Sequence, residues 1–251
     1  SSVILRMRHD MKPFSRKLLK TLVTSSRASP PAVVRAYSGT FAILAKFSSE
    51  SAVSKTLDII LENVQSDEAR EQRFAGVFLL DLCRLASDVF VASRDRILPP
   101  VFVLMHHTEE KKVAELFSSI WAEGAPSDAA ALRLYHAEIV DLCSSHPDSD
   151  SWHTRSAAAR AVVSVVKKAR KSDFKLPFEH SARLSAQLAL KLNGRYWKGV
   201  ESVVEALALM GGDLALATLL KCLKRKKLQL ATIDALALTT SMIAAGAKEQ
   251  Q

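Results

Sequence analysis

The densest group of residues that could bind a metal lies near the middle of the chain. His106 and His107 are followed closely by Glu109 and Glu110. Neighbouring residues on a helix point about 100° apart, so the two imidazoles cannot easily face one ion. A helix boundary explains the group better, because histidine complements the negative end of a helix dipole and glutamate suits the start of the next helix. We therefore predict a helix boundary here and no metal site.

Two further pairs lack the geometry that catalysis requires. His136 and Glu138 are two positions apart, and side chains at that spacing diverge on a helix. Cys143 and His146 lie near a predicted helix end, but a nucleophile also needs a third group that orients the base, and none is evident. The sequence contains no H-E-x-x-H, G-x-S-x-G, G-x-x-x-x-G-K or G-x-G-x-x-G motif. We predict that the protein is not an enzyme and has no catalytic, metal-binding or cofactor-binding residues.

Runs of basic residues are the clearest candidates for binding a partner. One run is Lys224, Arg225, Lys226 and Lys227, and another ends a predicted helix at residues 167–171. Such a ridge could meet phosphate or an acidic protein face. Cations at helix ends also complement the dipole, and this explanation is favoured because aromatic residues do not interleave with the lysines along the sequence. The first run is kept as the candidate partner-binding site.

Composition narrows the class of protein. The 251 residues are 48% hydrophobic and 24% charged, which excludes intrinsic disorder, and only 8 are glycine. Scarce glycine argues against doubly wound nucleotide-binding folds and propellers. The net charge of +9 favours nucleic acid, anionic lipid or an acidic protein surface as a partner.

The cysteines indicate the redox compartment, and the apolar stretches and first residues show whether a membrane segment or signal peptide is expected. Three widely spaced cysteines indicate reduced thiols used as small apolar side chains: Cys83, Cys143 and Cys222. No apolar stretch reaches the length of a transmembrane segment, and residues 1–10 do not read as a signal peptide. Because the chain does not begin with Met, we expect it to be a fragment of a much longer chain.

Apolar residues recur at helical spacing along nearly the whole chain, whereas period-two alternation never persists. Start signals and apolar faces predict helices over residues 30–47, 67–86, 127–145, 151–170 and 195–210, among about twelve in all. Short breaks between them are typical of antiparallel neighbours. The sequence therefore predicts an all-α fold.

Several local details can be predicted as well. Ser29 can cap the helix that follows it, and Pro99 with Pro100 should open a helix. One apolar stripe, at steps of four, four and three, consists of Val33, Tyr37, Phe41 and Leu44. Packing between repeats explains the three tryptophans better than ligand stacking does: Trp121, Trp152 and Trp197.

A basic residue recurs near the start of every second helix, at Arg35, Arg73, Lys112, Arg155 and Lys198, with intervals of 38, 39, 43 and 43 residues. A period near forty with two helices per unit matches HEAT or armadillo repeats. Each helical hairpin has an apolar face too large to leave exposed, so neighbours stack. We predict an α-solenoid of HEAT/armadillo-like hairpins in which residues 1–251 form one continuous segment of about six helix pairs, rather than a non-repetitive helical bundle.

Short segments also match one known family in order and spacing. These segments are Ala32–Arg35, Ile97–Pro100, Glu109–Lys111, Ile120–Glu123, Leu132–Tyr135, Ser151–Trp152 and Gly194–Gly199. With them, the stretch from Val33 to Gly212 resembles the carboxy-terminal HEAT-repeat region of the large proteasome adaptor and scaffold family of eukaryotes. The basic run around Lys224–Lys227 and the connection Ser172–Lys175 depart from the family pattern.

The resemblance implies a non-enzymatic adaptor of the cytosol and nucleus that binds the regulatory and core particles of the proteasome. In that family the solenoid tethers the two particles, monitors their assembly and links proteasomes to membranes and transport machinery. It implies no small-molecule substrate and no cofactor. The positive charge of this chain would complement an acidic proteasome surface by steering and specificity.

Other classes of HEAT-repeat protein fit less well. A nuclear-transport receptor is usually acidic and grips basic cargo, whereas this chain carries +9. A HEAT-like nucleic-acid enzyme would need an acidic residue beside aromatic groups in a basic groove, and the sequence offers no such cluster. A non-catalytic scaffold that binds nucleic acid or another acidic partner through its basic surface is the alternative. Nucleic acid is disfavoured, and a steep loss of affinity with salt would reveal it.

Overall fold

The structure is a computed structural model that describes residues 14–145, 151–171, 174–192 and 196–248. Within these ranges the chain forms thirteen helices and no strand, which confirms the predicted all-α fold. In chain order they are α2 (Ser15–Ser26), α3 (Pro31–Ala45), α4 (Glu50–Val64), α5 (Ala69–Leu85), α6 (Ser87–Ala92), α7 (Arg94–Leu104), α8 (Lys111–Gly124), α9 (Asp128–Ser145), α10 (Trp152–Lys171), α11 (Phe178–Leu192), α12 (Val200–Met210), α13 (Gly212–Cys222) and α14 (Gln229–Lys248). No helix in the described ranges has the length and apolarity needed to cross a membrane.

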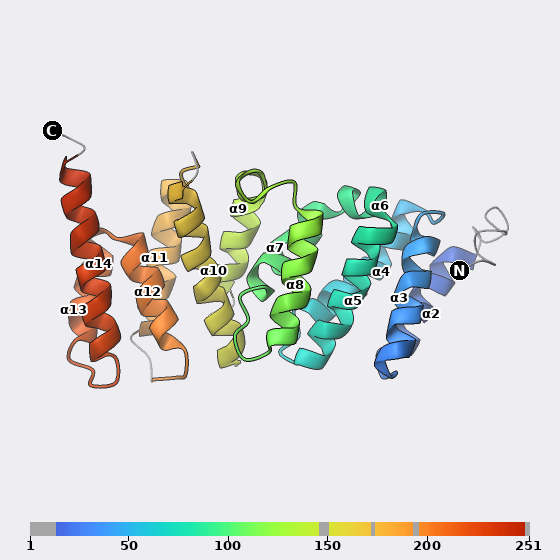
Figure 1. The fold of residues 1–251 in the computed structure, drawn as a ribbon, viewed down its shortest axis with the longest axis horizontal. Coiled ribbons are helices and arrows are strands. Elements are labelled where there is room, and N and C mark those ends of the chain that lie inside the picture. The colour runs from blue at the N-terminus through green and yellow to red at the C-terminus, as the bar shows by residue number, and fades with distance from the viewer. Residues whose placement is uncertain (1–13, 146–150, 172–173, 193–195, 249–251) are drawn as a thin grey trace. The chain divides into compact units, whose positions relative to one another are not determined.

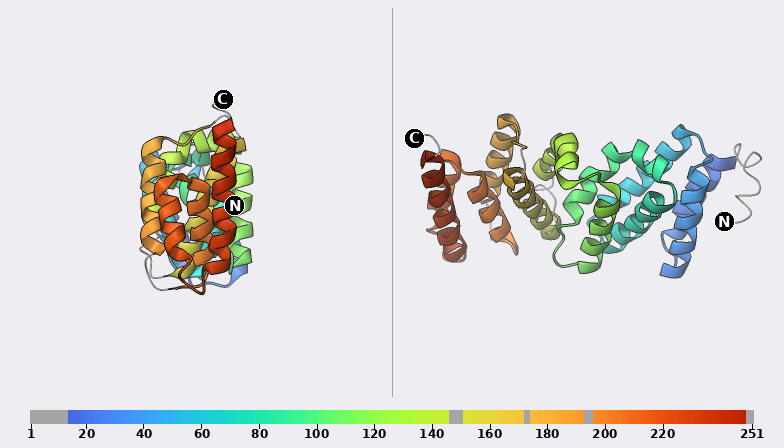
Figure 2. Two further views of the ribbon diagram at one scale, coloured as in Figure 1. Left: turned by 90° about the vertical axis from the view of Figure 1, so that its left-hand side faces the viewer. Right: turned by 45° about the horizontal axis from the view of Figure 1, so that its top comes forward.

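The helices group into two compact units. The first unit contains Glu110–Pro126 and the described residues up to Met105. It is built from the antiparallel pairs α2–α3, α4–α5 and α7–α8, with the short helix α6 between α5 and α7 (Figures 1 and 2). The second helices of successive pairs pack together, α3 on α5 and α5 on α8, while the first helices α2, α4 and α7 form the other row.

The second unit contains His106–Glu109 and the described residues from Ser127 onward. It repeats the arrangement with the pairs α9–α10, α11–α12 and α13–α14. Here α10 packs on α12 and α12 on α14, and α9, α11 and α13 follow one another in the other row. Both units are therefore stacks of helical hairpins, as predicted. That the two form one continuous solenoid over residues 1–251 stays a prediction.

The start of α3 differs from the sequence expectation. Pro31 occupies its first turn and Pro30 is the N-cap residue, but no side chain caps it. The Ser29 hydroxyl instead donates to the Ser25 carbonyl oxygen at 3.2 Å, so the predicted cap was wrong. Phe41 is buried as predicted, whereas Val33 is 36% exposed because the buried face of α3 is centred one position later, on Val34.

The two consecutive prolines do not open a helix. Pro99 and Pro100 lie inside α7, which begins at Arg94, and this prediction was therefore wrong. A proline has no N–H, so the carbonyl groups of Asp95 and Arg96 cannot receive the usual intrahelical hydrogen bond. All residues from Ile97 to Leu104 are buried, and this tertiary packing outweighs the local preference for a helix start.

Six ion pairs among the described residues join side chains about forty residues apart. The two members of each pair are separated by 38 to 44 residues along the chain. The pairs are Arg27–Glu71, Arg96–Asp58, Arg84–Glu123, Lys168–Asp128, Arg183–Asp141 and Lys167–Glu205. The separation is close to the predicted period near forty. Five of these pairs join neighbouring hairpins within one unit, whereas Lys168–Asp128 joins the two helices of the pair α9–α10. Because they are largely exposed, each contributes only about 0.2–1 kcal/mol, and apolar burial must supply most of the stability.

Two aromatic residues of the first unit pack closely between helices. Phe78 lies against Phe41, with ring centroids 5.4 Å apart, and joins α5 to α3. Phe90 of α6 is 1% exposed and fills the space beside Gly124, the last residue of α8. A Cβ atom added at Gly124 would lie 2.6 Å from the Cε1 atom of Phe90, which is too close for a buried ring to accommodate freely.

We predict that Gly124→Ala lowers the free energy of unfolding by about 1–3 kcal/mol, because it overpacks the Phe90 ring. Gly39→Ala in α3 is the matched control. A Cβ atom there would meet only ordinary contacts, 3.8 Å from Leu85 Cδ1 and 3.9 Å from Asp81 Oδ2. The control should gain up to about 1 kcal/mol from higher helix propensity. Urea unfolding followed by circular dichroism measures both values, and equal shifts of the two variants would contradict the packing argument.

A second prediction concerns the Arg84–Glu123 pair. The hydrogen bond from Arg84 lowers the pKa of Glu123 below its ordinary value. The folded state therefore favours the carboxylate, so the stabilisation is present above the ordinary pKa and is lost as the pH falls through the lowered value. We expect Arg84→Ala to cost about 0.2–1 kcal/mol at neutral pH and almost nothing at about pH 2.

Denaturant unfolding of the unchanged chain and of Arg84→Ala, repeated from neutral pH down to about pH 2, measures the free energy that the pair contributes at each pH. Arg35→Ala serves as control, because Arg35 is exposed on α3 and makes no ion pair with any described residue. A cost of Arg84→Ala that stays constant down to about pH 2 would show that the pair does not act through the charge of Glu123.

Candidate interaction surface

The histidine and glutamate group in the middle of the chain lies at a helix boundary, as predicted. α7 ends at Leu104, and α8 begins at Lys111 with Glu110 as its N-cap residue. His107 is buried, and its ring stacks on that of His153, with centroids 5.7 Å apart. Among the described residues, no three or more His, Cys, Asp or Glu side chains come together in a way that could hold a metal ion.

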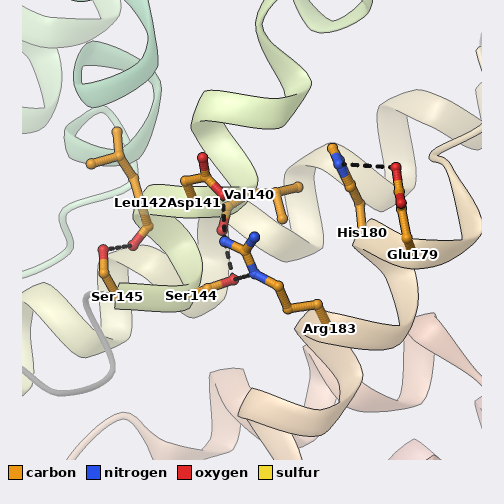
Figure 3. A network of polar contacts seen from close by, with 8 residues as sticks. All are labelled: Val140, Asp141, Leu142, Ser144, Ser145, Glu179, His180 and Arg183. Carbon is orange, nitrogen blue, oxygen red and sulfur yellow. Dashed lines mark hydrogen bonds and ion pairs between the residues drawn. The ribbon is translucent and has the colours of Figure 1, made fainter.

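A polar network joins α9 to α11 (Figure 3). The Arg183 guanidinium pairs with Asp141, with Nη2 and Oδ1 2.5 Å apart, and its Nε donates to the Ser144 hydroxyl at 3.3 Å. His136 on α9 also lies beside His180 on α11, with ring centroids 5.2 Å apart. These contacts connect the first helices of neighbouring pairs. His136 therefore has a packing role between repeats.

The cysteines are buried, and none of them forms a disulfide. Burial raises the pKa of the Cys143 thiol to about 12 and raises that of Cys83 and of Cys222 as well. Because the thiolate is the reactive form, all three stay protonated near neutral pH. The predicted use of these thiols as small apolar side chains is confirmed. His146, the residue considered beside Cys143, lies outside the described residues.

The predicted basic run forms the turn between α13 and α14. Backbone hydrogen bonds shape this turn, from Arg225 N–H to the Cys222 carbonyl oxygen at 2.9 Å and from Leu228 N–H to that of Arg225 at 2.8 Å. Leu228 is fully buried and fixes the end of the turn to the core. The Arg225 side chain donates to the carbonyl oxygen of Leu192, the last residue of α11. Arg225 thus ties the turn to the preceding hairpin.

The three lysines of the turn have a different setting. Lys224, Lys226 and Lys227 are exposed, and none makes an ion pair with a described carboxylate. The Lys227 ammonium lies 4.9 Å from the centre of the Tyr196 ring. The sequence analysis treated these four residues as one group. In the structure, the three lysines are exposed, whereas Arg225 holds the turn against the end of α11. Whether they bind a partner stays a prediction.

Aromatic rings and cations alternate in space beside this turn. Lys198 lies over the Trp152 ring, with Nζ 4.7 Å from its centre, and Arg155 lies over Trp197 at 4.8 Å. Both contacts run between α10 and the segment that precedes α12. Aromatic residues do not interleave with the basic runs along the sequence, but these ring partners are about one repeat away, so the linear sequence hides the contacts.

The starts of α10, α12 and α14 lie along one edge of the second unit, the lower edge in Figure 1. We call this surface the aromatic–basic edge. It consists of Trp152, Arg155, Tyr196, Trp197, Lys198, Lys224, Lys226 and Lys227. Trp152 and Trp197 join neighbouring pairs, as predicted. Trp121 instead packs on Phe102 of its own pair, with ring centroids 4.9 Å apart.

We predict that Arg225→Ala lowers the free energy of unfolding by about 1.5–3 kcal/mol, because a carbonyl group at the end of α11 loses a charged donor. Lys226→Ala, one position further along the same turn, should change it by less than about 0.5 kcal/mol. Thermal and urea unfolding measure both variants. An Arg225→Ala variant as stable as Lys226→Ala would mean that the contact with Leu192 contributes nothing.

Comparison with known proteins supplies a family context. Residues 1–64 match the family described as proteasome adapter and scaffold protein ECM29, HEAT-repeat domain. The human proteasome adapter and scaffold protein ECM29 is 23% identical over 205 residues, which make up 79% of this chain and 11% of that protein. The proteasome component ECM29 of Saccharomyces cerevisiae is 24% identical over 207 residues, 82% of this chain and 11% of that protein.

Among solved structures, the crystal structure of an engineered protein matches with a TM-score of 0.43 at 18% identity, over 89% of this chain and 98% of that one. The chain spans about 11% of the length of the two curated relatives. Similarity to both relatives nevertheless extends over most of the chain. The resemblance predicted from the sequence is confirmed: this chain is similar to the HEAT-repeat proteasome adapter and scaffold proteins.

Proposed function

We propose that this chain is a non-enzymatic scaffold segment that binds the proteasome and helps to tether it or to monitor its assembly. The observation that supports this most is the similarity to two proteins named for the proteasome over about four fifths of the chain. The architecture suits the role, because stacked hairpins present a long surface and bind through distributed contacts rather than one pocket.

The side chains that attracted attention as possible catalysts have packing roles instead. His107 stacks on His153, His136 lies between helices, and Cys143 is a buried thiol with a raised pKa. Each of these groups is engaged within its own unit rather than presented to a substrate. This supports a binding role without catalysis, small-molecule substrate or cofactor.

The proposal extends to the partner and to the cellular location. The regulatory and core particles of the proteasome are the proposed partners, and the cytosol and nucleus are the proposed locations. Three free thiols fit a reducing compartment. The net charge of +9 would steer the chain toward an acidic surface of the proteasome.

The aromatic–basic edge favours a second candidate function. Exposed lysines beside aromatic rings are typical of surfaces that bind single-stranded nucleic acid or another acidic partner. A scaffold for such a partner would use the same hairpin stack. Nucleic-acid binding should weaken steeply as salt rises, because counterions are released from the phosphates.

Co-sedimentation with purified proteasome at about 150 mM salt, where surface charges are already screened, tests the proposed function. We expect the 251-residue chain to migrate with the proteasome, and an excess of single-stranded nucleic acid should leave that migration unchanged. A chain that stays at the top of the gradient would argue against a proteasome contact in this region. Capture by the nucleic acid would favour the second candidate.

A further inference from the structure

We propose that the aromatic–basic edge binds an extended, acidic segment of a partner protein through the partner's carboxylate groups. The inference deepens the proposed function by giving the chemistry of one partner, and it rests on that function only in taking the chain to be a scaffold. The edge is formed by three successive hairpins of the second unit, whose second helices α10, α12 and α14 pack in order.

Charge is the first argument for an acidic partner. Several cations elsewhere in the described chain pair with a carboxylate about forty residues away, as Arg183 does with Asp141. In contrast, Lys224, Lys226 and Lys227 are exposed without such a pair among the described residues. Three neighbouring ammonium groups repel one another, and a partner that brings carboxylates relieves this repulsion.

The acidic residues near the edge are already engaged. Glu109 pairs with Lys198, with Oε1 and Nζ 3.0 Å apart, and Glu201 accepts a hydrogen bond from the Tyr196 hydroxyl at 2.8 Å. That bond raises the pKa of Tyr196. Lys198 remains 66% exposed despite its pair, so its ammonium group can still contact a partner. The edge therefore keeps a net positive character.

The aromatic rings argue for carboxylates over nucleic-acid bases. A base stacks on an open ring face, but here a cation covers one face of each ring: Lys198 on Trp152, Arg155 on Trp197 and Lys227 on Tyr196. Each ring holds its cation by a cation–π contact and limits its rotamers. Cations fixed in this way lose less entropy when they bind an anion.

Apolar side chains next to the basic turn indicate the rest of the partner's composition. Leu230 and Ile233 follow the turn by three and six residues and are 75% and 51% exposed. They are three residues apart on α14 and so share one helix face. An acidic segment that also carries Leu or Phe would satisfy both the lysines and this apolar pair.

Helix spacing gives the length of segment required. Packed helices lie about 8–10 Å apart, so the starts of α10, α12 and α14 span roughly 16–20 Å. An extended chain covers about 3.3 Å per residue, so about six residues reach across the edge. A probe peptide of about twelve residues, rich in Asp and Glu with Leu and Phe between them, covers it with room at both ends.

The test is fluorescence anisotropy of this labelled peptide with the 251-residue chain at about 150 mM salt. Lys224→Glu, Lys226→Glu and Lys227→Glu are combined in one variant, and we expect at least a roughly tenfold loss of affinity. The control variant combines Arg16→Glu, Lys17→Glu and Lys20→Glu, which are exposed on α2 and change the net charge equally. It should bind the peptide within about twofold of the unchanged chain.

Two further probes separate charge recognition from other binding. A peptide with Asn and Gln in place of Asp and Glu should bind at least about tenfold more weakly. A single-stranded oligonucleotide of matching length should bind more weakly than the acidic peptide. Equal binding of the neutral peptide, an equal loss in the control variant, or tighter binding of the oligonucleotide at the same lysines would each overturn the inference. Circular dichroism and melting temperature show that each variant is folded.

Co-sedimentation of the same variants with purified proteasome distinguishes a failure of this inference from a failure of the proposed function. If the acidic peptide binds at the edge and the proteasome does not co-sediment, the proposed function fails and the inference stands. If the proteasome co-sediments with both variants and no acidic peptide binds, only the inference fails.

Discussion

Each helical hairpin of this chain must bury an apolar face that it cannot cover by itself, and the next hairpin is what covers it. The second helices stack on one another within each unit, α3 on α5 on α8 and α10 on α12 on α14. Side chains such as Phe41 and Phe78 meet across these contacts and are fully buried. Burial of a large apolar side chain contributes about 1.5–3 kcal/mol, several times the contribution of an exposed ion pair. The stacking of hairpins therefore sets the positions from which the polar side chains make their contacts.

Stacking at a fixed period also brings together polar residues that lie far apart in the sequence. Arg84 meets Glu123, 39 residues later, and Arg183 meets Asp141, 42 residues earlier. The same register places Lys198 over Trp152 and Lys227 over Tyr196. Cations of this chain thus have two uses, since some join hairpins and others remain exposed along one edge. This division is what distinguishes a structural arginine such as Arg225 from the lysines beside it.

A binding surface of this kind suits a scaffold. Its contacts are spread over successive hairpins, so affinity builds from several modest interactions rather than from one deep site. Charge at the edge acts on the rate of encounter and on the choice of partner, because exposed ion pairs add little net affinity. His107, His136 and Cys143 have packing roles, so side chains of types that often act in catalysis contribute here to contacts between helices.

The sequence by itself determined the helical class, the two-helix repeat of about forty residues, the helix boundary between His106 and Glu110, and the basic run at residues 224–227. These features follow from local propensity and periodicity, which act over a few turns of helix. Only the tertiary structure decided that Pro99 and Pro100 lie inside a helix, that Arg225 binds the end of α11, and that rings and cations alternate at one edge. Each of these depends on the register between neighbouring hairpins, which is set by side-chain packing across the stack, and no local pattern encodes it.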